Sequence, residues 1–137
     1  MIAIIDYGVG NLFSLKSSLA AIGREAVVTG DRAVLRAASH VILPGVGAFG
    51  DAAARLRAVG MAEAVLEAAA AGKPVLGICL GMQLLLERSF EYGEHPGLGL
   101  IPGEVRPIRD VIPAGLAVPH MGWNALRFPA ERPRSPI

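Results

Sequence analysis

One short segment of the chain contains the residue types that nucleophilic catalysis requires. Gly77-Ile78-Cys79-Leu80-Gly81 lies between an apolar run and a helical pattern, as in a nucleophile elbow with cysteine in place of serine. The flanking glycines permit a sharp turn that lifts the Cys79 side chain out of the sheet at the carboxyl end of a strand. The amino end of the following helix favours the thiolate, and the Leu80 N–H points to where an oxyanion would develop. We therefore interpret Cys79 as a nucleophile rather than a buried structural cysteine.

A second glycine-rich segment, Pro44-Gly45-Val46-Gly47-Ala48-Phe49-Gly50, follows another apolar run. Its glycines match the G-x-G-x-x-G pattern of dinucleotide sites. That pattern normally belongs to the first strand–helix unit of its fold, and here no acidic residue ends a following strand about 20 residues later. Two interpretations are left open. The segment is either an ordinary tight turn or a loop beside the elbow whose backbone N–H groups supply a second oxyanion donor.

The three histidines are scattered and lack the spacing of metal ligands. His40 begins an apolar run, which indicates a structural or surface role. His95 precedes Pro96 and is expected in a loop. His120 belongs to Pro119-His120-Met121-Gly122-Trp123-Asn124, a segment that holds the only tryptophan. The sequence therefore predicts no metal site.

Apolar runs alternate with helical patterns along most of the chain, which predicts an α/β fold. The runs are continuously apolar, as in a buried and mostly parallel central sheet, with helices on both faces. Leu12, Leu15, Leu19 and Ile22 fall on one face of the first helix. Asp31 and Asp51 are the expected N-caps of later helices. The expected strands are 2–5, 26–29, 40–43 and 74–78, and the expected helices are 11–22, 31–38, 51–71 with a break near Gly60, and 80–88; after residue 91 we expect short strands or loops at 99–108, 116–118 and 125–128.

The composition limits the class of protein. A length of 137 residues fits one domain spanning 1–137, and 53% hydrophobic against 18% charged residues excludes disorder. The net charge of +1 and the lack of a basic cluster argue against nucleic-acid binding. No stretch offers the roughly 20 apolar residues of a membrane span, and the amino terminus lacks the basic region of a signal peptide. A single cysteine fits a reducing compartment, so we expect a cytoplasmic protein.

Taken together, the motifs resemble those of the class I glutamine amidotransferases. The resemblance is specifically to the glutaminase subunits of imidazole glycerol phosphate synthases, which act in histidine biosynthesis. Each matching segment alone would be weak, but they occur in the order of that family and cover nearly the whole chain. The segments are Asp6–Leu12, Pro44–Phe49, Gly77–Gln83, Gly97–Gly103 and Pro119–Asn124.

This resemblance implies a role for each matching residue. Cys79 would attack the side-chain amide of glutamine, with the N–H groups of Leu80 and Val46 as the oxyanion hole. The Val-Gly sequence of this subfamily implies that a peptide must rotate before the hole forms. The other implied substrate-binding residues are Gly45, Gly47 and Gln83, and the residues implied to face a partner protein are Asn11, Pro119, His120, Met121, Gly122, Trp123 and Asn124.

The implied reaction is the hydrolysis of L-glutamine to glutamate and ammonia through a cysteine thioester. No cofactor is implied. The implied partner is a (β/α)8-barrel cyclase, with which the glutaminase forms a heterodimer. The ammonia would react in that barrel to give imidazole glycerol phosphate and an aminoimidazole carboxamide ribonucleotide.

The chain departs from the family pattern in one respect. Family members carry a catalytic His and Glu two residues apart on a late strand, and these 137 residues contain no such pair. We expect a truncated product or partial record of a longer protein, with a degenerate protein as the alternative, and therefore a form that is inactive or strongly impaired. Two other functions are left open: a non-catalytic module that binds the cyclase, and another class I amidotransferase or cysteine-elbow hydrolase.

Overall fold

The computed structural model describes residues 1–125 and 127, and it divides into two compact units, 1–107 and 108–137. The interpretation of 1–137 as one domain remains a prediction.

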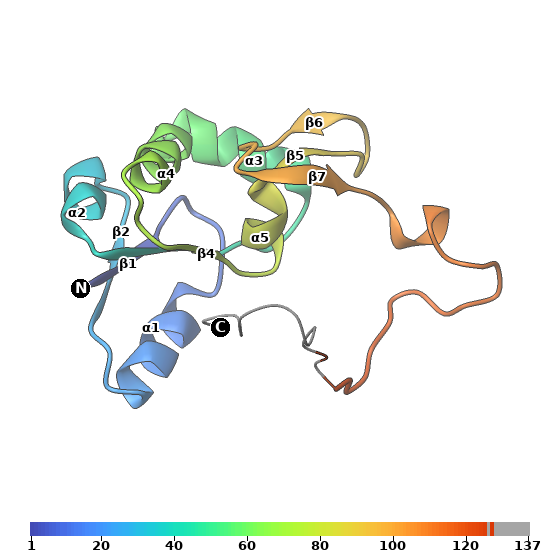
Figure 1. The fold of residues 1–137 in the computed structure, drawn as a ribbon, viewed down its shortest axis with the longest axis horizontal. Helices are drawn as coiled ribbons and strands as arrows, with labels where there is room; N and C mark the ends of the chain where they lie inside the picture. The colour runs from blue at the N-terminus through green and yellow to red at the C-terminus, as the bar shows by residue number, and fades with distance from the viewer. Residues whose placement is uncertain (126, 128–137) are drawn as a thin grey trace. The chain divides into compact units, whose positions relative to one another are not determined.

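A parallel sheet of four strands forms the centre of the first unit (Figure 1). The strands are β1 (Ile2–Ile5), β2 (Ala26–Thr29), β3 (His40–Leu43) and β4 (Val75–Gly77), arranged in the order β2-β1-β3-β4. This arrangement confirms the predicted α/β class and parallel sheet. Continuously apolar strands suit such a sheet, because both of its faces receive helices.

The helices of this unit are divided unequally between the two faces of the sheet. The helix α1 (Leu12–Ala21) lies on one face, whereas α2 (Arg32–Ala37), α3 (Phe49–Ala58) and α4 (Met61–Ala70) lie on the other (Figure 1). The Asp31 carboxylate caps α2 by accepting a hydrogen bond from the Ala33 N–H at 2.7 Å, as predicted. The prediction that Asp51 caps the next helix was wrong, because α3 begins at Phe49 and Asp51 lies in its first turn.

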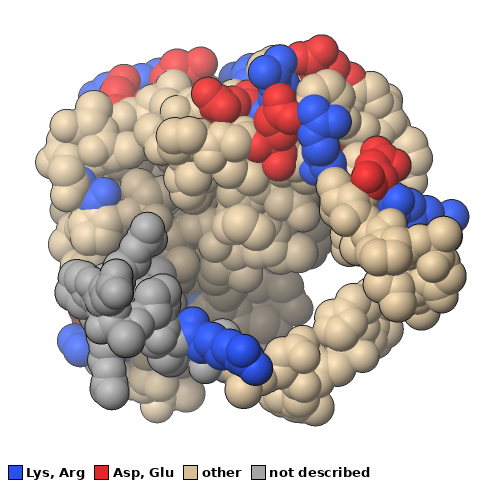
Figure 2. Space-filling view, turned by 45° about the vertical axis from the view of Figure 1, so that its right-hand side comes forward, with Lys and Arg blue, Asp and Glu red and all other residues tan. Residues whose placement is uncertain are grey.

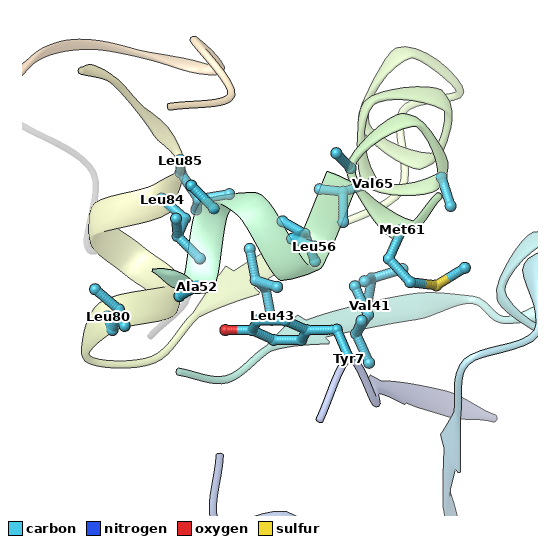
Figure 3. Packing of buried hydrophobic residues seen from close by; sticks show 14 of the residues in the cluster. Tyr7, Val41, Leu43, Ala52, Leu56, Met61, Val65, Leu80, Leu84 and Leu85 are labelled. Carbon is cyan, nitrogen blue, oxygen red and sulfur yellow. The ribbon is translucent and has the colours of Figure 1, made fainter. Parts of the chain in front are cut away.

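The hydrophobic core lies between one face of the sheet and the helices α3 and α4 that cover it (Figure 3). Phe49, Leu56 and Met61 are almost completely removed from solvent, and so are the strand residues Val41 and Leu43. Alanines of both helices are also buried, so each helix lies close to the rest of the core on its inner face.

The opposite face of the sheet carries a thinner layer. No residue of α1 is buried, and Leu12, Leu15 and Leu19 are only half-buried. Ile22 is 70% exposed, because the helix ends before it and Ile22 serves as the C-cap. The prediction that Ile22 shares the packed face of this helix was therefore wrong.

A second sheet follows the elbow segment. It contains β5 (Leu86–Ser89), β6 (His95–Pro96) and β7 (Ile101–Val105), with β5 in the middle. The predicted helix 80–88 was wrong beyond Leu84, because α5 (Leu80–Leu84) ends there and the chain continues as β5. His95 lies in β6 rather than in a loop.

Side chains of opposite charge pair along the exposed surface of this second sheet. Arg88 of β5 binds Glu104 of β7 at 2.9 Å and Glu94 at 3.2 Å, and Arg106 binds Glu104 at 2.6 Å. Figure 2 shows acidic and basic side chains interleaved along the upper edge of the molecule. The guanidinium of Arg106 also lies 4.4 Å from the centre of the Phe90 ring.

The second unit has little regular structure in its described part. A 3-10 turn covers Ile108–Asp110, the Val118–Pro119 peptide bond is cis, and residues 116–118 form a loop. The expected element at 125–128 falls mostly outside the described residues. Among the described residues of the whole chain, no helix is both long and apolar enough to cross a membrane.

Candidate active site

Two neighbouring strands place the elbow and the glycine loop at the same edge of the sheet. Leu43, the last residue of β3, lies in register with Gly77, the last residue of β4. The Ile78 N–H donates to the Leu43 carbonyl oxygen at 3.0 Å, which extends the pairing one residue beyond β4. Because parallel strands end at a common edge, Pro44–Gly47 and Ile78–Cys79 emerge side by side, as the second interpretation of the glycine loop requires.

Cys79 has the backbone conformation of a nucleophile elbow. Its φ of 55° and ψ of −117° lie in a region that a non-glycine residue adopts only at a cost of about 1–3 kcal/mol. The residue links β4 directly to α5, and its side chain is exposed to solvent. Leu80 is the first residue of α5, so its N–H projects outward from the amino end of that helix and is free of an intrahelical partner. The structure therefore presents a thiol beside a backbone donor.

Glycines on both sides of Cys79 let main chain pack directly against main chain. A Cβ atom on Gly81 would overlap the carbonyl oxygen of Leu43, and one on Gly77 would lie 2.5 Å from the Met82 Cα. A Cβ atom on Gly45 would lie 2.7 Å from the Gly81 nitrogen. The elbow and the glycine loop thus approach each other through backbone atoms, and no larger residue fits at these three positions.

The middle of the glycine loop is open to solvent. Gly45 is buried, but Val46 is 52% exposed and Gly47 is exposed with a φ of +93°. Gly47 needs glycine for its backbone conformation rather than for space, because in the described part of the chain no neighbouring atom lies within 4 Å of the position of an added Cβ. The N–H groups of this loop are the candidates for the second oxyanion donor.

Two side chains that the sequence analysis did not single out hold the ends of the loop. The buried hydroxyl of Tyr7 donates to the Pro44 carbonyl oxygen at 2.8 Å. A carboxylate oxygen of Glu91 accepts from the Phe49 N–H at 2.7 Å. Burial raises the pKa of Tyr7 from 10 to about 12, so the phenol keeps its proton at neutral pH.

The Glu91 contact also bears on the dinucleotide interpretation of the glycine pattern. In a dinucleotide site the amino end of the following helix receives the pyrophosphate. Here the Glu91 carboxylate takes a hydrogen bond at the start of α3, and the His95 ring packs on Gly50. A negative side chain at that position opposes phosphate binding.

Gln83 lies one helical turn after Cys79, as the spacing predicts. It is half-buried, and its N–H donates to the Cys79 carbonyl oxygen at 3.2 Å. The structure therefore brings Cys79, Leu80, Gln83 and the loop 45–47 into one neighbourhood of the first unit. The roles assigned to these residues by resemblance remain predictions.

The predicted partner-facing residues fall in two places. Asn11 belongs to the first unit, where its side chain caps α1 by accepting from the Ser14 N–H at 3.2 Å. Residues 119–124 belong to the second unit, where His120 and Asn124 are linked by a side-chain contact of 3.0 Å and Trp123 is fully exposed. Within the described residues, no group of His, Cys, Asp and Glu side chains could hold a metal ion.

An exposed thiol on a strained elbow, beside a glycine loop at the carboxyl edge of a parallel sheet, defines a class of enzyme that attacks carbonyl groups through cysteine. The comparisons with known proteins identify the family. The sequence model of glutamine amidotransferase class-I matches residues 3–126, and the chain belongs to this family.

Several curated relatives share about half of the aligned residues. Imidazole glycerol phosphate synthase subunit HisH of Sulfurimonas denitrificans is 54% identical over 97% of this chain and 64% of its own length. The subunit of the same name from Moorella thermoacetica is 54% identical over 93% of this chain and 59% of its own length. This chain therefore spans about six tenths of the length of these relatives. A crystal structure of a glutamine amidotransferase, 23% identical, shares the fold with a TM-score of 0.66 over 77% of this chain and 56% of that one.

Proposed function

We propose that this chain carries the nucleophile of a glutaminase subunit of imidazole glycerol phosphate synthase. The observation that carries the proposal is the positive φ of Cys79 on an elbow packed against the glycine loop. The similarity to HisH subunits of several bacteria supports the same assignment. A cytoplasmic location is part of the proposal, since the single cysteine would stay reduced there.

In the proposed reaction the Cys79 thiolate adds to the side-chain carbonyl carbon of L-glutamine. The carbonyl oxygen gains the negative charge and accepts hydrogen bonds from the Leu80 N–H and, after a peptide rotation, from the Val46 N–H. Collapse of this adduct breaks the C–N bond, and the nitrogen takes a proton and leaves as ammonia. Water then attacks the γ-glutamyl thioester, which releases glutamate and restores the thiol. No cofactor takes part.

The proton transfers need a base, which the family takes from a His-x-Glu pair that these 137 residues lack. We therefore propose that this chain by itself forms a covalent adduct but turns over slowly. A thiol depends less on its base than a serine hydroxyl does, because a few per cent of it is ionised at neutral pH.

The proposed partner is a (β/α)8-barrel cyclase that receives the ammonia. Residues 119–124 and Asn11 would contact it, and the exposed Trp123 and Met121 suit an interface, where large amphipathic side chains supply much of the binding free energy. Trp123→Ala is then expected to weaken binding to the cyclase by at least ten-fold.

A glutamine-like diazo-ketone, 6-diazo-5-oxo-norleucine, tests the proposed chemistry. Incubation with the 137-residue chain should attach one reagent to Cys79, which intact-mass and peptide mass spectrometry would detect. Because the chain has a single cysteine, Cys79→Ser is a clean control and should remain unlabelled. The labelling rate should exceed that of the same chain unfolded in urea by at least ten-fold.

The outcomes separate the glutaminase from the alternative binding module. Labelling no faster than in the unfolded chain, both alone and with the cyclase present, would contradict a glutaminase site. If such a chain still bound the cyclase, and if Cys79→Ala left the glutamine-dependent rate of the complex unchanged, the non-catalytic module would be the correct function.

A further inference from the structure

The glycine loop is fixed at its beginning by a buried side chain from a different strand. Tyr7 follows β1, is 4% exposed, and donates its hydroxyl hydrogen to the Pro44 carbonyl oxygen at 2.8 Å. Figure 3 shows the ring beside Leu43, with the hydroxyl directed toward the side on which Leu80 lies. Since a peptide group is planar, holding the Pro44 oxygen also fixes the direction of the Gly45 N–H.

Further contacts surround the same peptide. The position of a Cβ on Gly45 lies 3.0 Å from the Tyr7 hydroxyl oxygen, and that of a Cβ on Gly10 lies 3.0 Å from the Pro44 Cβ. The preceding carbonyl, that of Leu43, accepts the hydrogen bond from Ile78. The Pro44–Gly45 peptide is therefore enclosed on several sides.

The end of the loop is fixed by a second side chain. Glu91 binds the Phe49 N–H at 2.7 Å, while its own N–H donates to the hydroxyl oxygen of Ser89 at 3.1 Å. Ser89 is completely buried, and it is paired with Val105 in the second sheet. The neighbouring cap residue, Ala48, offers no side chain to cap α3, so Glu91 supplies the missing acceptor.

Between these two fixed points the loop has room to change its conformation. Val46 is half-exposed, and no described residue lies within 4 Å of the position of a Cβ on Gly47. The peptide that carries the Val46 N–H, Gly45–Val46, is the next one after the peptide held by Tyr7. Among the described residues, the Gly45–Val46 peptide makes no backbone hydrogen bond, so a peptide that is held in place is followed by one that can rotate.

We propose that Tyr7 is a positioning residue for the oxyanion hole: its hydroxyl holds the Pro44–Gly45 peptide, and with Glu91 at the far end it confines loop movement to the three peptides between Gly45 and Ala48. This inference rests on the proposed glutaminase function. Tyr7 does not touch the reacting atoms in this scheme. It acts by keeping Gly45 in place while the Val46 N–H turns toward the oxyanion.

Tyr7→Phe tests the proposal, because it removes only the hydroxyl oxygen. Two thiol reagents are compared on the 137-residue chain. With 6-diazo-5-oxo-norleucine, the carbonyl oxygen is held in the proposed hole while the thiolate displaces nitrogen gas from the neighbouring carbon. Iodoacetamide is a small alkylating agent that loses iodide and needs no bound position to react with an exposed thiol. We expect the diazo-ketone rate to fall about three- to ten-fold, the effect of one hydrogen bond. The iodoacetamide rate should stay within two-fold.

Tyr92→Phe is the matched control. It deletes the same atom from the other tyrosine, which is 91% exposed, and should change neither rate. Equal rates for Tyr7→Phe and the wild-type chain with the diazo-ketone would overturn the proposal. So would a parallel fall with both reagents, since that would indicate general damage to the thiol environment.

Amide hydrogen exchange of the wild-type chain, measured by NMR, tests whether the loop has a hinge between two fixed ends. It needs no variant and no reaction at Cys79. We expect the Gly45 and Phe49 amides to exchange at least ten-fold more slowly than those of Val46 and Gly47. Exchange at one common rate across the loop would overturn the hinge. If exchange shows the hinge but the diazo-ketone never labels wild-type Cys79 above the unfolded rate, the glutaminase function has failed, and the catalytic role of Tyr7 is overturned with it.

Discussion

The two faces of the central sheet differ in how completely their helices are packed. On the face covered by α3 and α4, Phe49 lies in a closed core. Leu56 and Met61 belong to the same core (Figure 3). On the face of α1 no helical residue is buried, and Phe13 is 82% exposed. Both helical layers carry apolar residues at regular spacing, so spacing alone does not determine burial. A helix face becomes core only where a second layer encloses it.

The largest expected difference between the faces is in the stability lost when a phenylalanine on each face is replaced by alanine. Phe49→Ala should lower the free energy of unfolding by about 3–5 kcal/mol, because it leaves a cavity in a closed core. Phe13→Ala should change it by less than about 0.5 kcal/mol. Urea denaturation of both variants measures the contrast. Similar losses would mean that the α1 face is closed in solution, for example by self-association, which sedimentation would detect.

A smaller contrast is expected from the only two lysines of the chain. The Lys73 ammonium donates to the carbonyl oxygens of Arg36 and of Ala38, the latter at 2.8 Å, and so holds the carboxyl end of α2. Lys73→Met keeps most of the stem but leaves these carbonyls without their donor, and should cost about 2 kcal/mol. Lys16→Met, on the exposed side of α1, should be neutral within about 0.5 kcal/mol. Thermal unfolding of the pair would contradict this account if both variants behaved alike.

The smallest expected contrast is between the two tyrosines, in how much each contributes to the loss of stability at alkaline pH. Because burial raises the pKa of Tyr7 to about 12, the unfolded chain loses this proton near pH 10, before the folded chain does. The folded state therefore binds more protons in this range, and its stability falls as the pH rises, by about 1.4 kcal/mol at pH 11. Tyr7→Phe should lack this component, whereas Tyr92→Phe should keep it. Urea midpoints at pH 9 and pH 11 provide the measurement, and identical pH dependence in all three proteins would contradict it.

Local signals predicted the first part of the fold well. The strands were predicted from continuously apolar runs, and Asp31 caps the helix that follows it, as predicted, whereas the cap formed by Asn11 was not predicted. The helix after Cys79 was predicted too long because Leu84-Leu85-Leu86 is compatible with either a helix or a strand. Its true end depends on β7, which pairs with β5 from more than ten residues further along the chain.

The candidate site was predicted where its chemistry is local and missed where it depends on distant residues. The glycines around Cys79 predict a sharp turn within five residues, and the structure contains this turn. Glu91 lies 42 residues from the amide that it binds, so no spacing rule could connect them. Tyr7 lay within a motif segment, but a phenol among glycines gives no indication of which carbonyl it will reach.

The interlocked glycines at positions 45, 77 and 81 have a consequence for how such a protein can change over evolution. The separation between the elbow and the glycine loop is set mainly by main chain against main chain, with the Tyr7 hydroxyl beside the contact at Gly45. Substitutions in the core can therefore raise or lower stability while that separation stays constant. The geometry of such a site is preserved while the residues around it change, but the three glycine positions themselves tolerate almost no variation.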